Sequence, residues 1–361
     1  MTRKRLLLLL LIAAILGTLI YLQIHAWRRF DWDKFVEGAE GLNYWKVLAG
    51  VLLIYSADFL RTIRWKIFLR PTRPNASWWA LVSPQYVGFT GLALLGRPGE
   101  FVRPYLIARR ENVSVASQIA IWLVERVFDI GAVTLIFGID IFFVPYMRES
   151  YPPWRIAGYA LIGFFIALLG MLWVLHRNGP AASRWACMKI SRISPATGAN
   201  MEKKLRALAE GLHAIRDLTS FAQLSLISIA IWLLVALAYR FVTHAYPVES
   251  GLPNLNLPEV VLLMAASIAG GVVQLPLVGG GSQLATIGVL LADSPKGFGY
   301  TDAPELAVSC GILLWLVTFM SVVPLGLVLA HRERLSLRRL SQESEAEVES
   351  EETAGPSLPI P

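Results

Sequence analysis

Long apolar segments are the feature that most constrains the fold of this chain. Six segments are long enough, as helices, to cross the roughly 30 Å of hydrocarbon in a bilayer. They are residues 6–24, 45–65, 117–145, 155–175, 221–245 and 305–330. Hydrophobic residues make up 55% of the 361 residues and charged residues only 16%. A water-soluble domain of this length could not bury so much apolar surface, so the sequence predicts an all-α polytopic membrane protein with about six transmembrane helices.

Two further apolar stretches, 78–95 and 259–275, run into helix breakers. The first leads into the Gly-Arg-Pro-Gly run at 96–99, and the second into Pro276 and the glycines at 279–281. If both stretches are re-entrant hairpins, 24 of the 33 Lys and Arg residues fall in loops on one side of the membrane and seven on the other. Because Lys and Arg concentrate on the cytoplasmic side, we expect two re-entrant helical hairpins and cytoplasmic N- and C-termini.

This topology divides the chain into two similar units. Residues 45–145 and 221–330 each read span, hairpin, span, with opposite orientations in the membrane. Paired broken helices in an inverted repeat are typical of transporters with a binding site near the bilayer midplane. We expect one membrane domain over 1–335, with a cytoplasmic amphipathic linker at 176–220 and an acidic disordered tail at 336–361.

The first candidate site lies at the tip of the first hairpin and comprises Arg97, Gly99, Glu100 and Arg103. Ionised groups at bilayer depth cost about 2.5–3.5 kcal/mol each on insertion scales, so their presence requires a reason. Arginine offers a forked donor to phosphate, which indicates a phosphate-binding or gating site. We also expect Glu100 to begin a new helix. The alternative is a cytoplasmic loop with ordinary surface charges.

A second group, Glu125, Arg126 and Asp129, lies inside the span at 117–145. The two carboxylates are four residues apart, so they share one helix face and need nearby cations. We expect Arg126 to point elsewhere, so that arginines of the first hairpin or Arg61 supply the partners. A coupling network and a structural ion-pair network both remain open.

A third group, Asp58, Arg61 and Arg64, repeats at three-residue intervals near the inner end of the second span. Arg64 precedes Trp65 and Lys66, so we expect it to be an interface anchor that extends its charge to the headgroups. Asp58 and Arg61 lie deeper and are expected to join the buried network.

The fourth group forms the tip of the second hairpin: Gly279, Gly280, Gly281, Ser282 and Gln283. We expect Ser282 to cap the following short helix, whose free N–H groups could bind an anion. Alternatively, the glycines only allow two helices to cross closely.

Other classes of site are not indicated. Cys187 and Cys310 lack metal-ligand spacing and are interpreted as buried small hydrophobes. The net charge of +7 is concentrated in loops beside apolar spans, which favours contact with anionic lipid over nucleic acid. We expect no metal and no cofactor.

Together these residues resemble the lysylphosphatidylglycerol synthase transmembrane, or flippase-like, family over roughly residues 5–335. The motifs are Arg61 with Arg64-Trp65, Arg97-x-Gly99-Glu100-x-x-Arg103, and Glu125-Arg126-x-x-Asp129. The family pattern Pro-Gly-Gly-x-Gly-x-x-Glu at the second hairpin is only partly present. Val278, Ser282 and Ala285 replace its proline, third glycine and acid, so the role of that acid does not carry over.

The resemblance implies an eight-element helical membrane domain that, in larger relatives, moves a phospholipid beside a soluble aminoacyltransferase domain. No loop here exceeds about 45 residues, so we do not expect this chain to synthesise lysyl lipid itself. We predict a translocator of a phosphate-bearing lipid in the cytoplasmic membrane. No GxxxxGK[ST] loop occurs, so the chain is not expected to be driven directly by ATP.

The partners expected are membrane lipids, and a lipid-modifying enzyme is a candidate partner. An alternative function is a membrane-embedded transferase, or a transferase subunit, acting on glycolipid or polyprenyl-phosphate substrates, because paired buried carboxylates also suit general acid–base catalysis. A third is a scaffold that recruits an enzyme through the linker or the tail.

Overall fold

The structure, a computed structural model, describes residues 33, 36, 40–143, 156, 159–160, 162–167, 218–271, 274–275, 279–291 and 304–332. Its helices are α3 (Tyr44–Leu69), α4 (Trp78–Leu95), α5 (Val102–Glu111), α6 (Val115–Phe143), α10 (Leu218–Thr243), α11 (Leu257–Gly270), α12 (Gly281–Leu291), α13 (Pro304–Trp315) and α14 (Val323–Arg332). Shorter elements are the 3-10 turns η1 (Arg97–Phe101), η2 (Val248–Ser250) and η3 (Leu252–Asn254), the π-helix η4 (Leu316–Met320), and the strands β1 (Gln274–Leu275) and β2 (Gly279–Gly280).

The structure confirms that the chain is mainly helical, as expected. Four expected spans fall on described residues and are helical, as α3, α6, α10 and the continuous run α13–η4–α14. Within the described residues, Thr219–Thr243 and Pro304–Arg332 are both long and apolar enough to cross a membrane. The span expected at 155–175 is described only in part, while the first span, most of the linker and the acidic tail lie outside the described residues.

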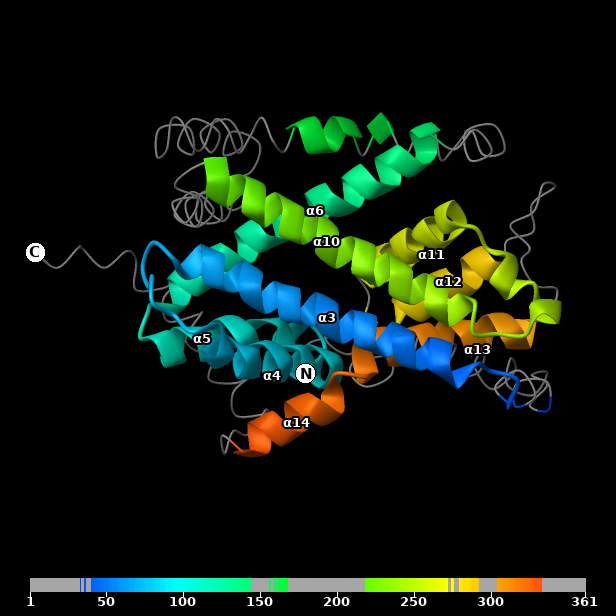
Figure 1. Cartoon of the computed structure of the whole chain (residues 1–361), viewed down its shortest axis with the longest axis horizontal. Helices are drawn as coiled ribbons and strands as arrows, with labels where there is room; N and C mark the ends of the chain where they lie inside the picture. The colour runs from blue at the N-terminus through cyan, green and yellow to red at the C-terminus, as the bar shows by residue number, and fades with distance from the viewer. Residues whose placement is uncertain are drawn as a thin grey trace, which may run out of the picture.

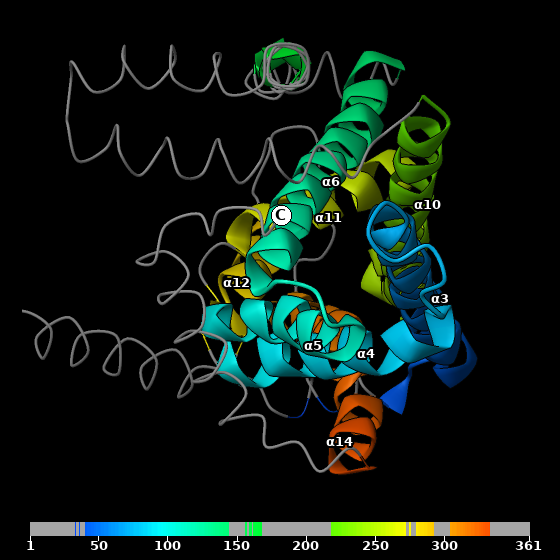
Figure 2. The same cartoon turned by 90° about the vertical axis from the view of Figure 1, so that its left-hand side faces the viewer.

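An antiparallel pair, α3 and α10, runs through the molecule, and Figures 1 and 2 both show the two helices side by side. Near the start of α3, Lys46 Nζ donates to the carbonyl of His244 at 2.6 Å, just beyond the end of α10. After the end of α3, Arg70 donates to the side chain of Gln223 at 2.9 Å, near the start of α10. The two helices therefore run in opposite directions and are tied at both ends.

The first hairpin consists of α4, η1 and α5. Gly96 ends α4 with a φ of 72°, which favours glycine. A Cβ on Gly99 would overlap the carbonyl of Gly91, and a Cβ on Gly88 would overlap the Cβ of Arg103. The two arms close on each other only because these positions lack side chains, and this close packing seats Arg103 against α4.

The second hairpin consists of α11, the β1–β2 ladder and α12. The strands are antiparallel, with Gln274 opposite Gly280. A Cβ on Gly270, at the end of α11, would overlap the carbonyl oxygen of Gly281, at the start of α12. As in the first hairpin, absent side chains allow the two arms to meet.

The helices of the two expected units have corresponding packing partners. In the first unit α3 packs on α4, α4 on α5, and α5 on α6. In the second unit α10 packs on α11, α11 on α12, and α12 on α13. Likewise α6 packs on α10 and on α11, while η4 packs on α3 and α14 packs on α4. Figure 1 shows the α4–α5 hairpin and the α11–α12 hairpin toward opposite ends of the long axis of the molecule. The two units are therefore arranged alike within the bundle.

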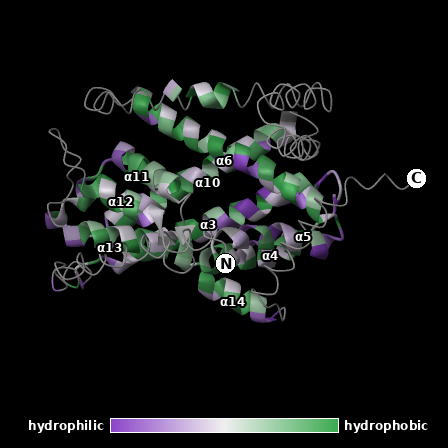
Figure 3. Ribbon diagram, turned by 180° about the vertical axis from the view of Figure 1, so that it is seen from behind, coloured by the Kyte–Doolittle hydropathy of each residue, from purple (hydrophilic) through white to green (hydrophobic). Residues whose placement is uncertain are grey.

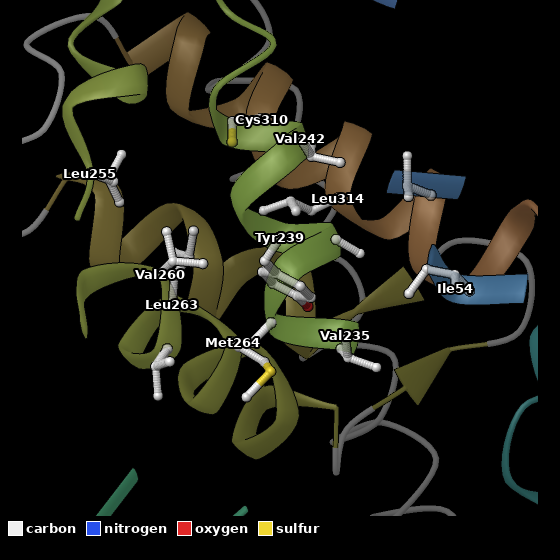
Figure 4. Packing of buried hydrophobic residues seen from close by; sticks show 14 of the residues in the cluster. Ile54, Val235, Tyr239, Val242, Leu255, Val260, Leu263, Met264, Cys310 and Leu314 are labelled. Carbon is white, nitrogen blue, oxygen red and sulfur yellow. The ribbon is translucent and has the colours of Figure 1, made fainter. Parts of the chain in front are cut away.

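The largest hydrophobic cluster joins α10, α11 and α13 (Figure 4). Tyr239 projects from α10 into this cluster, where its hydroxyl donates to Ser267 Oγ at 2.8 Å. Cys310 is fully buried there, as expected for a small hydrophobe. In Figure 3 most helices are hydrophobic, and hydrophilic segments lie beside α5 and α6 and also at the opposite end, near α11 and α13. Among the described residues, the buried arginines Arg64 and Arg103 both lie in the first unit.

Candidate functional site

Arg64 joins three helices through one guanidinium. Its Nη2 lies 2.5 Å from Glu125 Oε1, and its Nη1 lies 2.6 Å from Asp129 Oδ1. The same Nη1 donates to Ser228 Oγ of α10 at 2.8 Å. The side chain of Arg64 is 0% exposed, so the expectation of an interface anchor is wrong. Arg64 is the centre of a buried network.

The reason lies in the rotation of α3. Arg64 falls seven residues after Ala57 and four before Phe68, and all three are buried, so they share the helix face that turns inward. The adjacent Trp65 is also buried and donates from Nε1 to Gln118 Oε1 at 3.0 Å. A Trp and a Lys beside Arg64 resemble an interfacial anchor in the sequence, but the packing of α3 against α6 turns this face to the interior.

Arg103 approaches Glu125 from the first hairpin. Its Nη2 forms an ion pair with Glu125 Oε2, on the opposite oxygen from Arg64. Its Nη1 donates to Gln85 Oε1 of α4 at 3.2 Å, and its guanidinium lies 4.4 Å from the centre of the Trp65 ring. Glu125 thus links the hairpin to α6 and, through Arg64, to α3.

Arg126 is the third arginine beside these carboxylates. Its Nη2 lies 3.5 Å from Glu125 Oε2 and 3.3 Å from Asp129 Oδ2. The expectation that Arg126 points elsewhere is therefore wrong. Its long side chain reaches the two carboxylates of its own helix, α6. Trp232 of α10 donates from Nε1 to Asp129 Oδ1 at 3.2 Å, so Asp129 has partners on three helices.

Asp58 and Arg61 form a neighbouring ion pair within α3. Their side chains meet at 2.7 Å, and that of Asp58 is buried. The guanidinium of Arg61 lies over Phe89 and Trp232, at 5.3 and 5.9 Å from the ring centres. Within the described residues, Arg61 pairs with Asp58 and not with the carboxylates of α6.

We call Arg64, Arg103, Glu125, Arg126 and Asp129 the arginine–carboxylate cluster. It holds three cations and two anions, and Glu100 also acts electrostatically on Arg126. Removing one partner of a buried ion pair costs about 3–5 kcal/mol, because the remaining charge stays uncompensated. Such a cluster can lock helices together, or exchange a carboxylate for another anion. Its guanidinium forks match the geometry of phosphate oxygens.

The tip of the first hairpin lies in η1. The backbone of Arg97 starts this turn, and the structure describes nothing of its side chain. Glu100 lies in the same turn, whereas α5 itself begins at Val102, two residues later than the helix start expected at Glu100. Gly99 is buried against α4, and the ring of Phe101, which ends the turn, lies 5.6 Å from that of Trp122 on α6. The structure therefore brings this tip beside α6, which carries three residues of the cluster.

The tip of the second hairpin is separate. Gly280 donates its N–H to Gln283 Oε1 at 2.9 Å. The helix α12 begins at Gly281, so Ser282 lies in its first turn and not at its N-cap, contrary to expectation. The carbonyl of Ser282 accepts from Thr286 Oγ1 at 2.8 Å. In the described part of the chain, no hydrogen bond or ion pair joins this tip to the cluster.

Sequence reasoning missed several partners of the cluster: Gln85, Ser228 and Trp232, and the central role of Arg64. Gln85 and Ser228 lie in helices that carry several other polar residues, so local sequence did not single them out. Among the described residues, no three His, Cys, Asp or Glu side chains are placed to hold a metal ion.

A family model described as "Lysylphosphatidylglycerol synthase TM region" matches residues 6–326. The match covers most of the 361 residues and includes both hairpins and the whole arginine–carboxylate cluster. No curated protein and no solved structure matches the chain.

Proposed function

The chain belongs to the lysylphosphatidylglycerol synthase transmembrane family, and from this premise we propose that it translocates a phosphate-bearing lipid across the cytoplasmic membrane. The observation that carries the proposal is the buried ion pair between Arg103 of the first hairpin and Glu125 of α6. The lipid is a phospholipid or a polyprenyl-phosphate-linked lipid. Its movement follows a gradient or is coupled to protons, without ATP hydrolysis by this chain.

In this proposal both hairpins are re-entrant, and the two units have inverted orientations. The matching contacts of the two units and the position of the hairpins toward opposite ends of the long axis support it (Figure 1). Arg70 follows α3, Arg109 and Arg110 lie in the last turn of α5, and Arg332 ends α14. These basic ends would face the cytoplasm, with both termini on that side.

Movement of the first hairpin away from α6 must separate Arg103 from Glu125. With nothing in exchange, two buried charges would lose a partner, at a cost of about 3–5 kcal/mol. A phosphate oxygen can replace the carboxylate, because a guanidinium presents parallel N–H donors to either group. Arg97 lies at the tip of the same hairpin. The hairpin would therefore move when a phosphate arrives and remain locked otherwise.

The outer half of the pathway would use neutral donors. The described tip residues 279–283 carry no cation, and the N–H of Gly280 is occupied by Gln283. Rotation of Gln283 would expose backbone N–H groups of the turn from Gly279 to Ser282 to a phosphate. Because neutral donors bind an anion more weakly than guanidinium does, this asymmetry favours release at the outer side.

The alternative is a transferase, or a transferase subunit, that uses the same buried carboxylates on a lipid-linked substrate. Glu125 and Asp129 already accept from guanidinium groups, so neither can reach a substrate without breaking an ion pair. Formation of a modified lipid by the purified protein and a labelled donor would favour this alternative.

The test is headgroup accessibility in proteoliposomes, measured by extraction or chemical quenching of a fluorescent phospholipid. Wild-type protein should accelerate exchange between leaflets, and the Arg103→Ala, Glu100→Gln double variant should not. A Glu249→Gln variant, changed at an exposed carboxylate in η2, is the matched control. If wild type is no faster than the double variant, the translocation proposal fails.

A further inference from the structure

Arg126 differs from the other arginines of the cluster in its exposure. Its side chain is 42% exposed, compared with 0% for Arg64 and 5% for Arg103. Its ion pairs, at 3.3 and 3.5 Å, are also longer than the 2.5 and 2.6 Å pairs of Arg64. Both ion pairs of Arg126 within the described residues run through Nη2, so neither of them uses Nη1.

One aromatic ring adjoins this guanidinium, and a second ring packs on the first. Trp122, one turn earlier on α6, lies with its ring centre 5.9 Å from the Arg126 guanidinium. The Trp122 ring is in turn 5.6 Å from that of Phe101, which ends η1. Both aromatic side chains are partly exposed. The surface therefore places a held cation beside two apolar rings, at the seam between the first hairpin and α6.

The surface lies within the helices but toward one of their ends. Arg64, which shares Asp129 with Arg126, lies five residues before the end of α3, about 8 Å along the helix axis, and Arg126 lies 11 residues after the start of α6, about 16 Å along its axis. A long arginine side chain can extend its charge from within a span toward the headgroups, and tryptophan is enriched where headgroups meet acyl chains. The anion present there in every bilayer is the lipid phosphate, and the aromatic rings provide an apolar surface for the lipid below it.

We propose that Arg126, with Trp122 and Phe101, is a docking site for the phosphate of a lipid in the cytoplasmic leaflet. The lipid would bind here from the side, next to Arg103 and the hairpin tip. Asp129 and Glu125 hold the guanidinium in position from behind, so little side-chain freedom is lost when the phosphate binds. The onward step to Arg103 rests on the proposed function, whereas the docking itself does not.

The test is binding of defined lipids to the purified full-length protein, followed by native mass spectrometry. Phosphatidylglycerol is the probe, diacylglycerol with the same chains lacks the phosphate, and inorganic phosphate lacks the chains. Loss of one charge-assisted hydrogen bond should weaken phosphatidylglycerol binding about tenfold in Arg126→Gln. Arg126→Lys keeps the charge but loses the forked donor, so its phosphatidylglycerol binding should fall between that of wild type and that of Arg126→Gln. Arg240→Gln, a second arginine substitution in α10, is the matched control and should leave binding unchanged.

Equal phosphatidylglycerol binding by wild type and Arg126→Gln would overturn the site. Binding of inorganic phosphate as tight as that of phosphatidylglycerol would overturn its assignment to a lipid. Should Arg126→Gln not yield a monodisperse protein, Trp122→Leu is the second variant and should also weaken binding. Loss of phosphatidylglycerol binding in Arg126→Gln, together with no translocation by wild type, would support the docking site and overturn the translocation proposal. Translocation by wild type, together with unchanged binding in Arg126→Gln, would support the translocation proposal and overturn the docking site.

Discussion

Glu125→Gln is the substitution that most directly tests the electrostatic reasoning. The Glu125 side chain is fully buried, with Arg64 on Oε1 and Arg103 on both oxygens. Two unit charges about 4 Å apart interact by about 4 kcal/mol at an effective dielectric constant of 20. Glutamine keeps the shape but removes the charge and turns an amide NH2 toward guanidinium donors. Arg64 then keeps only Asp129 as an ionic partner in the cluster, and Arg103 loses its ionic partner there.

We therefore expect Glu125→Gln to lower the free energy of unfolding by about 3–5 kcal/mol, the cost typical of breaking a buried ion pair. Denaturant titration in mixed micelles measures this change. Glu249→Gln, the same chemical change at an exposed position, should shift it by less than about 0.5 kcal/mol. Adding Arg103→Met to Glu125→Gln should recover part of the loss, because it removes an uncompensated cation. A loss below about 1 kcal/mol in Glu125→Gln, or no recovery in the double variant, would refute the reasoning.

Further predictions concern packing and ionisation. Gly99→Ala should destabilise the protein by about 1–3 kcal/mol in the same titration, because the new Cβ would overlap a backbone carbonyl of α4. Gly288→Ala, where nothing lies within 4 Å of the new Cβ, should be neutral or stabilising, and equal effects of the two would contradict this account. Asp140→Asn should cause no loss beyond about 0.5 kcal/mol, since no described residue forms an ion pair with this buried carboxyl; a larger loss would reveal a partner. Desolvation and a neighbouring arginine lower the pKa of His244, so an NMR titration should place it below the usual 6.5. The free energy of unfolding should fall as the pH drops below 6.5, because the unfolded chain binds a proton at His244 more readily than the folded chain does. A raised pKa would contradict the described environment.

Much of the helical architecture follows from local sequence. The stretch expected at 78–95 is α4 with the same bounds. The span expected at 45–65 is α3, which is a few residues longer, and the span expected at 221–245 is α10, which begins three residues and ends two residues earlier. Apolar length and glycine or proline breaks determine these limits, because the backbone must satisfy its hydrogen bonds within each helix when no water is present. The glycines at the two hairpins were equally visible in the sequence.

Ion pairing was less predictable, because it depends on how distant helices are rotated. Arg61 was a candidate partner for Glu125 and Asp129, yet it pairs with Asp58, while Arg64 reaches both carboxylates. The two arginines are three residues apart on one helix, and local composition favoured placing Arg64 at the interface. The rotation of α3 against α6 and α10 decides which of them points inward.

The sequence alone determined that this chain is a helical membrane protein with two helical hairpins interrupted at glycines, and that charged residues lie inside its apolar helices. These properties depend on composition and on neighbours within one turn, which the linear order contains. Only the tertiary structure decided that Arg64 and Arg103 both bind Glu125 and that Arg126 is the most exposed of the three arginines. Those outcomes depend on contacts between residues up to 61 positions apart, and on which face each helix turns to its neighbours.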